Sequence, residues 1–301
     1  MQWRKTATRT RLEAITAGHE TGVTRVGNAG GNGETGRDPA SARAAQPEVL
    51  VVSDHIVAGR LAEEAGQALM ALRARAGVLT PAALRDQGDH LSHVLLTEGL
   101  ARLRPDDAVL SEEGADDRSR LGSPRVWIID PLDGTREFGE PGRTDWAVHV
   151  ALVEHGIPVA AAVSLPAQGL MISAADPPSP PARRAGRLRL LVSRSHTPPE
   201  AVAIAEQLDA ELVYMGSAGA KTMAVVLGQA DAYVHLGGQY EWDSAAPVGV
   251  ALAAGLRATR IDGSPLRYNR PDPWLPDQVV CRSELHETLL AALRAHAAAV
   301  A

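Results

Sequence analysis

Residues 126–135 read Val-Trp-Ile-Ile-Asp-Pro-Leu-Asp-Gly-Thr, and this stretch decides how the rest of the sequence is interpreted. Its first four residues, 126–129, form a short apolar and largely β-branched run. Such a run is typical of a strand that is buried on both faces. We expect Pro131 to end the strand, because proline has no N–H for the hydrogen-bond ladder.

Two carboxylates follow the apolar run. Asp130 and Asp133 would repel each other and lose hydration at the end of a buried strand unless a cation neutralised them. Hard divalent ions such as Mg²⁺ bind oxygen ligands of this kind. Gly134 lets a backbone approach an anion closely, and the Thr135 hydroxyl can position a water. The stretch thus indicates a metal and phosphate site, whereas a bare D-x-x-D-G is by itself more typical of a strand followed by an Asx-type turn.

Size and composition restrict the class of protein. The chain has 301 residues, 45% hydrophobic and 22% charged, so we expect a folded protein with a large core, as one domain or two lobes. The net charge of −6 argues against non-specific nucleic-acid binding as the main function. The single Cys281 fits a reducing cytoplasm. Because there is neither a run of 18 apolar residues nor a signal-peptide h-region, we expect no stable membrane insertion.

The sequence suggests an extension and two lobes. Residues 1–46 are rich in Gly, Ala, Thr and Arg without an apolar period, which predicts a disordered extension. Folded structure is expected from Pro47. The proline-rich stretch 176–181 is the predicted boundary between an N-terminal α+β lobe, residues 47–182, and a C-terminal α/β lobe, residues 183–301.

Strand and helix patterns alternate along both lobes, which favours α/β layering. A first helix is predicted from near Pro47, with an apolar stripe at Val51, Ile56, Leu61, Ala65, Leu69 and Leu72. A second is predicted over residues 89–103, with a buried stripe at Leu91, Val94, Leu95, Leu100 and Leu103. Strands are expected at residues 108–110, 146–153, 159–164, 170–174, 188–192, 211–215, 231–235, 257–261 and 278–281. Further helices are expected at residues 198–208, 216–227 and 285–300, and from Trp242 onward.

Several polar residues near these elements are open to two interpretations. Glu112 follows a predicted strand and meets Asp130 if the two strands are neighbours, but it also suits a solvated turn. The Gly/Ser-rich stretch 216–221 opens a helix, which suits a phosphate or a plain N-cap. Asp243 can be a ligand or a helix cap, and His149 is more typical of a hydrogen-bonded sheet histidine than of a site residue.

Three ordered motifs together resemble those of the inositol monophosphatase superfamily of Mg²⁺-dependent, lithium-sensitive phosphatases. They are residues 111–113, 127–135 and 242–246, and the resemblance covers about residues 48–285. Residues 133–138 and 109–113, and Gly216-Ser217 followed by Lys221, resemble the 3'(2'),5'-bisphosphate nucleotidase branch, the CysQ proteins of sulfate assimilation. Residues 145–149 and 263–269 are similar to actinobacterial members. The resemblance implies a layered α-β-α-β-α sandwich.

The resemblance also implies roles for individual residues. Glu112, Asp130 and the Leu132 carbonyl would hold one Mg²⁺; Asp130, Asp133 and Asp243 would hold a second, with two or three ions per site. Asp89, which lies 23 positions before Glu112, would orient the attacking water with Thr135, although the threonine of the family's T-x-x-D segment is missing here. Backbone groups of Gly134, Thr135, Gly216 and Ser217 would hold the phosphate being removed. Lys221 and Arg136 would contact the other phosphate or the ribose, or are surface charges.

The implied reaction is hydrolysis of 3'-phosphoadenosine 5'-phosphate to AMP and phosphate, or of 3'-phosphoadenylyl sulfate to adenylyl sulfate, without a covalent intermediate. Paired metal ions suit this reaction because they activate a water and stabilise the leaving oxygen. Inositol 1-phosphate and fructose 1,6-bisphosphate are alternative substrates, because the same ligands serve those activities in the superfamily. A catalytically silent binding protein is the alternative from a different class. The resemblance is compatible with a homodimer.

Overall fold

A computed structural model describes residues 52–300 except 76, 78 and 196. The predicted extension, residues 1–46, and the predicted helix start near Pro47 and Val51 lie outside the described residues. The two-lobe division at 182/183 stays a prediction. Across the part of the chain that the structure describes, every helix is too short or too polar to cross a membrane.

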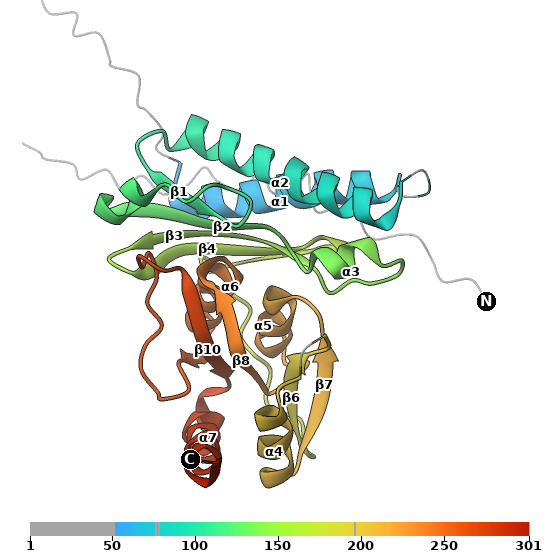
Figure 1. Ribbon diagram of the computed structural model, residues 1–301, viewed down its shortest axis with the longest axis vertical. Coiled ribbons are helices and arrows are strands. Elements are labelled where there is room, and N and C mark those ends of the chain that lie inside the picture. The colour runs from blue at the N-terminus through green and yellow to red at the C-terminus, as the bar shows by residue number, and fades with distance from the viewer. Residues whose placement is uncertain (1–51, 76, 78, 196, 301) are drawn as a thin grey trace, which may run out of the picture. The chain divides into compact units, whose positions relative to one another are not determined.

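Two five-stranded sheets form the framework (Figure 1). Sheet A has the order β1-β2-β3-β4-β5, with β1 parallel to β2 and antiparallel pairing elsewhere. Its strands are β1 (Ala108–Ser111), β2 (Arg125–Asp133), β3 (Ala147–Glu154), β4 (Ile157–Leu165) and β5 (Leu170–Ser173). Sheet B has the order β7-β6-β8-β10-β9. Its strands are β6 (Leu188–Ser193), β7 (Ala210–Met215), β8 (Ala232–Tyr240), β9 (Arg257–Thr259) and β10 (Trp274–Cys281).

Seven α-helices accompany the sheets within the described residues. They are α1 (Asp54–Arg73), α2 (Pro81–Leu103), α3 (Thr135–Gly139), α4 (Pro199–Gln207), α5 (Ala218–Val226), α6 (Glu241–Ala253) and α7 (His286–Val300). Short 3₁₀ segments lie at Arg118–Gly122, Pro166–Gln168 and Ser283–Leu285. Figure 1 shows α1 and α2 side by side over sheet A, with α5 and α6 on the other side of that sheet.

Three apolar cores join five layers of helices and strands. This arrangement confirms the predicted α-β-α-β-α sandwich. The first joins α1 and α2 to one face of sheet A and includes Trp127 and Ile129. The second fills the space between the sheets, where α5 and α6 lie, and includes Val126 and Ile128. The third joins the outer face of sheet B to α4 and α7. Alternate residues of β2 thus enter different cores, so this strand is buried on both faces as its composition predicts.

The structure corrects several boundaries: β8 continues to Tyr240, β9 ends at Thr259 and β10 begins at Trp274. Pro131 does not end the strand: β2 continues to Asp133, with a register shift between Asp130 and Asp133. A proline is accepted there because a bulge interrupts the ladder. The second helix begins at Pro81, earlier than predicted, because Thr80 caps it and proline suits the first helical position.

The predicted helical stripes were partly wrong. In α1, Ile56 is exposed, whereas Leu61, Ala65 and Leu69 are buried as expected. In α2, Leu95 is exposed and the neighbouring Leu96 is buried. Because α2 packs on both α1 and β2, its buried face follows two partners, and this widens and rotates the apolar stripe.

Candidate active site

The parallel pairing of β1 and β2 brings Glu112 to Asp130. Ser111 is in register with Ile129, and the Glu112 N–H donates to the Ile129 carbonyl at 3.4 Å. The Glu112 side chain lies close enough to Asp130 for its charge to raise the pKa of that aspartate. The expectation that these acids meet if their strands are neighbours is therefore confirmed.

A bulge in β2 turns Asp130 and Asp133 to one side. Asp130 pairs with His149 on β3, and Asp133 pairs with Ala147, so three steps on β2 match two on β3. In a regular strand, residues three positions apart would point to opposite faces. The extra residue removes that alternation, and both carboxylates face the layer of α5 and α6. Oδ1 of Asp130 also accepts from the Leu132 N–H at 3.0 Å, so an Asx-type contact is present as well.

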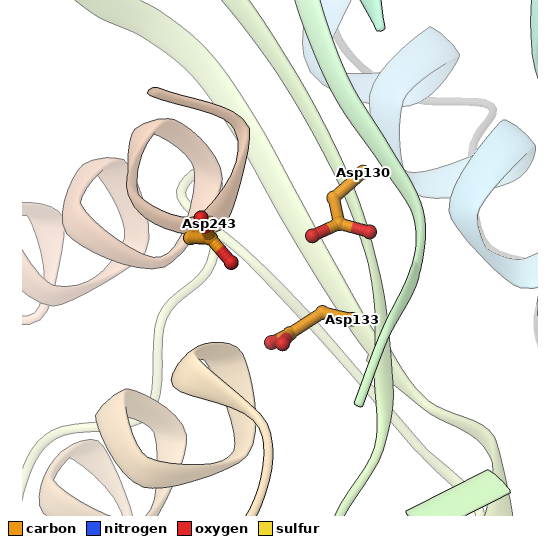
Figure 2. Close-up of side chains that lie close together, drawn as sticks. All are labelled: Asp130, Asp133 and Asp243. Carbon is orange, nitrogen blue, oxygen red and sulfur yellow. The ribbon is translucent and has the colours of Figure 1, made fainter. Parts of the chain in front are cut away.

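Asp243 reaches the same place from the first turn of α6. Its Oδ2 accepts from the Tyr240 N–H at 2.7 Å, so it caps the helix. One carboxylate oxygen from each of Asp130, Asp133 and Asp243 lies within 4.8 Å of the others. Figure 2 shows the side chains from β2 and α6 converging. A capping role and a ligand role are compatible here, because a carboxylate has two oxygens.

The clustered acids are unstable as anions without a counter-charge. Burial, together with the charges of Glu112 and the other two aspartates, raises the pKa of Asp130 well above its usual value. Burial and the charge of Asp133 raise the pKa of Asp243 to about 6. Loss of hydration at the edge of the cluster, with the charge of Asp243, raises the pKa of Glu112 to about 7, although the residue as a whole is exposed.

One buried oxygen of this cluster has no hydrogen-bond partner among the described residues, namely Oδ2 of Asp130. A buried carboxylate oxygen normally has a partner. Oxygen ligands from several carboxylates are the donor set that hard divalent cations prefer. The three aspartates can therefore bind a metal ion, and this donor set fits one.

Asp133 differs from its neighbours because the start of α5 surrounds it. Its carboxylate accepts from the Ser217 hydroxyl at 2.5 Å, from the Ala218 N–H at 3.2 Å and from the Gly219 N–H at 2.7 Å. Burial alone would raise the pKa of Asp133, but the nearby His149 and these donors lower it to about 2. The N-terminal end of a helix dipole adds to that effect.

The Thr135 hydroxyl lies between two acceptors. Its Oγ1 is 3.2 Å from Asp89 Oδ1 and 2.9 Å from the Leu132 carbonyl oxygen. Burial, reinforced by the charge of Glu113, raises the pKa of Asp89 to about 6. The structure thus brings Asp89 and Thr135 together, although the usual threonine near Asp89 is missing from the sequence.

The other predicted substrate residues lie around this centre with protein partners of their own. The Gly216 N–H donates to Asp145 Oδ2 at 2.6 Å, and the Ser217 N–H donates to the Asp145 carbonyl at 3.3 Å. The buried Lys221 donates from Nζ to the Gly216 carbonyl, and burial lowers its pKa to about 8. Arg136 is exposed and pairs with Glu140 at 3.2 Å. Contacts of these residues with a substrate stay predictions.

His149 is a hydrogen-bonded sheet histidine as expected, but its contact with the metal candidate Asp133 was not foreseen. This side chain is fully buried, with Nε2 3.1 Å from Asp133 Oδ2 and Nδ1 3.0 Å from the Trp242 carbonyl oxygen. Burial alone would lower its pKa, but Asp133 and the Trp242 carbonyl raise it. A signal was present, because an apolar strand rarely carries a histidine without a polar partner.

Comparisons with known proteins find relatives in sequence and in fold. A Mycobacterium leprae (strain TN) protein called 3'-phosphoadenosine 5'-phosphate phosphatase is 51% identical over 255 residues, covering 81% of this chain and 94% of the relative. The 3'(2'),5'-bisphosphate nucleotidase CysQ of Escherichia coli (strain K12) is 33% identical over 198 residues, covering 62% of this chain and 80% of its own length. The crystal structure of CysQ from Bacteroides thetaiotaomicron superposes with a TM-score of 0.68 at 27% identity, covering 76% of this chain and 96% of that one.

The family assignment rests on a match over most of the described residues. Residues 55–298 match the inositol monophosphatase family. That range includes the three clustered aspartates and the Thr135–Asp89 pair. The chain therefore belongs to the inositol monophosphatase family.

Proposed function

We propose that this protein is a Mg²⁺-dependent phosphatase that hydrolyses 3'-phosphoadenosine 5'-phosphate to AMP and phosphate. The observation that carries the proposal is the convergence of Asp130, Asp133 and Asp243 within 4.8 Å, with one oxygen unpartnered among the described residues. The substrate class comes from relatives called 3'-phosphoadenosine 5'-phosphate phosphatase and 3'(2'),5'-bisphosphate nucleotidase. Release of adenylyl sulfate from 3'-phosphoadenylyl sulfate belongs to the same proposal, as does a role in sulfate assimilation.

The residues that would hold the ions are Glu112, Asp130, the Leu132 carbonyl, Asp133 and Asp243. Two or three Mg²⁺ ions would supply electrostatic stabilisation of the phosphoryl oxygens and a lower pKa for the attacking water. The Leu132 carbonyl oxygen lies 2.9 Å from the Thr135 hydroxyl, and because a carbonyl oxygen has two lone pairs it can also bind a cation.

Thr135 and Asp89 would orient the water and receive its proton. An oxygen lone pair of the water forms the new bond to phosphorus as the bond from phosphorus to the ribose 3' oxygen breaks. That oxygen takes up a proton from solvent, and Asp89 returns the proton of the attacking water to solvent. The Thr135 hydroxyl has one proton, so when it donates to Asp89 its lone pairs can accept from the water. A pKa of about 6 lets Asp89 exchange a proton near neutral pH.

Gly134 would let the phosphate approach the backbone. Its φ is +84°, and a Cβ there would lie 3.1 Å from the Ser217 Cβ and 3.2 Å from the Asp145 carbonyl oxygen. Gly216 and Ser217 would hold the phosphate only if their N–H groups leave Asp145. Arg136, whose side chain is exposed, would pair with the second phosphate of the substrate. Lys221 would reach that phosphate only if its Nζ leaves the Gly216 carbonyl, which makes it the more demanding of the two assignments.

A comparison of three substrates tests the proposal. Phosphate release from 3'-phosphoadenosine 5'-phosphate with Mg²⁺ is expected to exceed release from inositol 1-phosphate and fructose 1,6-bisphosphate. Preference for either of the other two would keep the metal site and overturn the nucleotide assignment. Asp133→Asn is expected to abolish phosphate release. If the wild type and this variant release phosphate equally slowly, the protein is catalytically silent. Lithium inhibition, a homodimer and a cytoplasmic location stay predictions.

A further inference from the structure

His149 is a buried polar side chain in the middle of β3. Its strand neighbours Val148 and Val150 belong to the core with α1 and α2. Because strand side chains alternate, His149 faces the opposite side, toward α6. Burying an imidazole costs free energy unless its ring nitrogens have partners. The partners of the two nitrogens therefore define the role of this residue.

Each ring nitrogen of His149 faces an acceptor from a different element. Nδ1 lies 3.0 Å from the carbonyl oxygen of Trp242, the residue directly before Asp243. Nε2 lies 3.1 Å from Oδ2 of Asp133 on β2. Nδ1 is hydrogen-bonded to the carbonyl oxygen, whereas Nε2 contacts the carboxylate by distance alone, without the alignment of a hydrogen bond. One side chain thereby connects a clustered carboxylate to the turn that carries another.

Gly219 provides the space for this connection. A Cβ at position 219 would lie 2.0 Å from His149 Nε2, far inside the closest approach of non-bonded atoms. The same residue donates its N–H to Asp133 Oδ2 at 2.7 Å. A glycine at the start of α5 thus allows the helix backbone and the imidazole to reach one carboxylate oxygen together.

We infer that His149 is a positioning residue that sets the separation between Asp133 and Asp243, and the inference rests on the metal site of the proposed function. The two aspartates come from β2 and α6, so neither element alone determines the distance between their carboxylates. The His149 ring contacts both the Asp133 carboxylate and the peptide group that precedes Asp243. It therefore determines the distance between the two carboxylates. Residues that orient metal ligands in this way typically change metal affinity about 10- to 100-fold when they are replaced.

Three substitutions separate the two contacts. His149→Asn places an amide nitrogen near the position of Nδ1 and can keep the bond to Trp242. His149→Gln reaches toward the position of Nε2 and can keep the contact with Asp133. His149→Leu removes both. Binding of Mn²⁺ alone, followed by electron paramagnetic resonance of the free ion, is expected to weaken about 10- to 100-fold in His149→Leu and less in the other two variants.

His286 is a matched control, because it is also buried but lies in α7 and contacts Thr259 at 3.1 Å. His286→Leu is expected to lower the melting temperature and leave Mn²⁺ affinity unchanged. Wild-type Mn²⁺ affinity in a folded His149→Leu would overturn the inference. If that variant does not fold, wild-type affinity in both His149→Asn and His149→Gln would overturn it instead. Mn²⁺ binding does not depend on turnover, so a failure of the wild type to hydrolyse the nucleotide would count against the proposed function alone.

Discussion

The Ser217 hydroxyl donates a 2.5 Å hydrogen bond to Asp133 and accepts one from the Ala220 N–H at 2.9 Å. The same atom therefore caps α5 and orients a clustered carboxylate of β2. Helix stability and ligand geometry are coupled at this position, because one side chain serves both. The coupling links residues that are 84 positions apart in the chain.

Ser217→Ala is expected to affect folding and metal binding together. Loss of the cap should lower the free energy of unfolding by about 0.5–2 kcal/mol. Loss of the donor should also weaken Mg²⁺ binding, because the Asp133 carboxylate loses one of the donors that orient it. Chemical denaturation measures the first effect and the Mg²⁺-induced rise in melting temperature measures the second.

Thr80 provides the control for this prediction, since its hydroxyl caps α2 by accepting from the Ala83 N–H at 3.2 Å. Thr80→Ala should cost a similar amount of stability and leave the Mg²⁺-induced rise unchanged. An equal loss of Mg²⁺ response in both variants would show that the response merely follows helix stability.

Gly134→Ala is expected to lose most activity because two costs combine. The φ of +84° is unfavourable for alanine, and the new Cβ would lie 3.1–3.3 Å from Ser217, Asp145 and Trp146. Gly142 has a similar φ of +78°, but no described atom lies within 4 Å of a Cβ there. Gly142→Ala should therefore show only the backbone cost, about 1 kcal/mol in unfolding experiments. Equal activity of the two variants would mean that close packing at Gly134 has no role in the reaction.

Much of this site could be predicted from sequence because its residue types carry the information. The motifs predict Asp130, Asp133 and Asp243 as ligands, and the structure brings the three side chains together. The strand-helix alternation in the second half of the chain was also recovered, since each element is short and bounded by turn residues. Such local patterns need no knowledge of what lies opposite.

The remainder depends on partners that are distant in sequence. The bulge at Pro131 exists because of the register with β3, which a single strand does not reveal. Leu96 is buried in place of the predicted Leu95 because of how α2 packs. The sequence predicts an ordinary strand histidine at His149, because the partners of this side chain belong to other elements, β2 and α6. Sequence periodicity describes one helix or strand at a time, whereas these features depend on how two elements pack against each other.

Protons and Mg²⁺ should compete for the clustered acids. The pKa values of about 7 for Glu112 and about 6 for Asp243 lie above those of ordinary carboxyl groups. The metal-free folded protein thus binds more protons than the unfolded chain in this range, and its stability should fall as pH rises through these values. Mg²⁺ binds the deprotonated acids, so the rise in melting temperature that it causes should grow between about pH 5 and about pH 8. Differential scanning fluorimetry measures this effect. A Mg²⁺-induced rise in melting temperature that does not change with pH would contradict the prediction.

Arg136→Ala tests whether an exposed arginine recognises the second phosphate. Arg136 pairs with Glu140 four positions later at 3.2 Å, and both side chains are substantially exposed. Such a pair contributes about 0–1 kcal/mol, so stability should barely change. A lost contact to phosphate should instead raise KM for 3'-phosphoadenosine 5'-phosphate several-fold, with kcat little affected.

Arg60 forms an equivalent exposed pair with Glu64 at 2.7 Å on α1 and serves as the control. Arg60→Ala should match Arg136→Ala in stability and match the wild type in KM. For a substrate with one phosphate group, such as inositol 1-phosphate, KM should be the same in Arg136→Ala and the wild type, because the lost partner is the second phosphate. An equal rise in KM for one-phosphate and two-phosphate substrates would instead place Arg136 beside the phosphate that is removed.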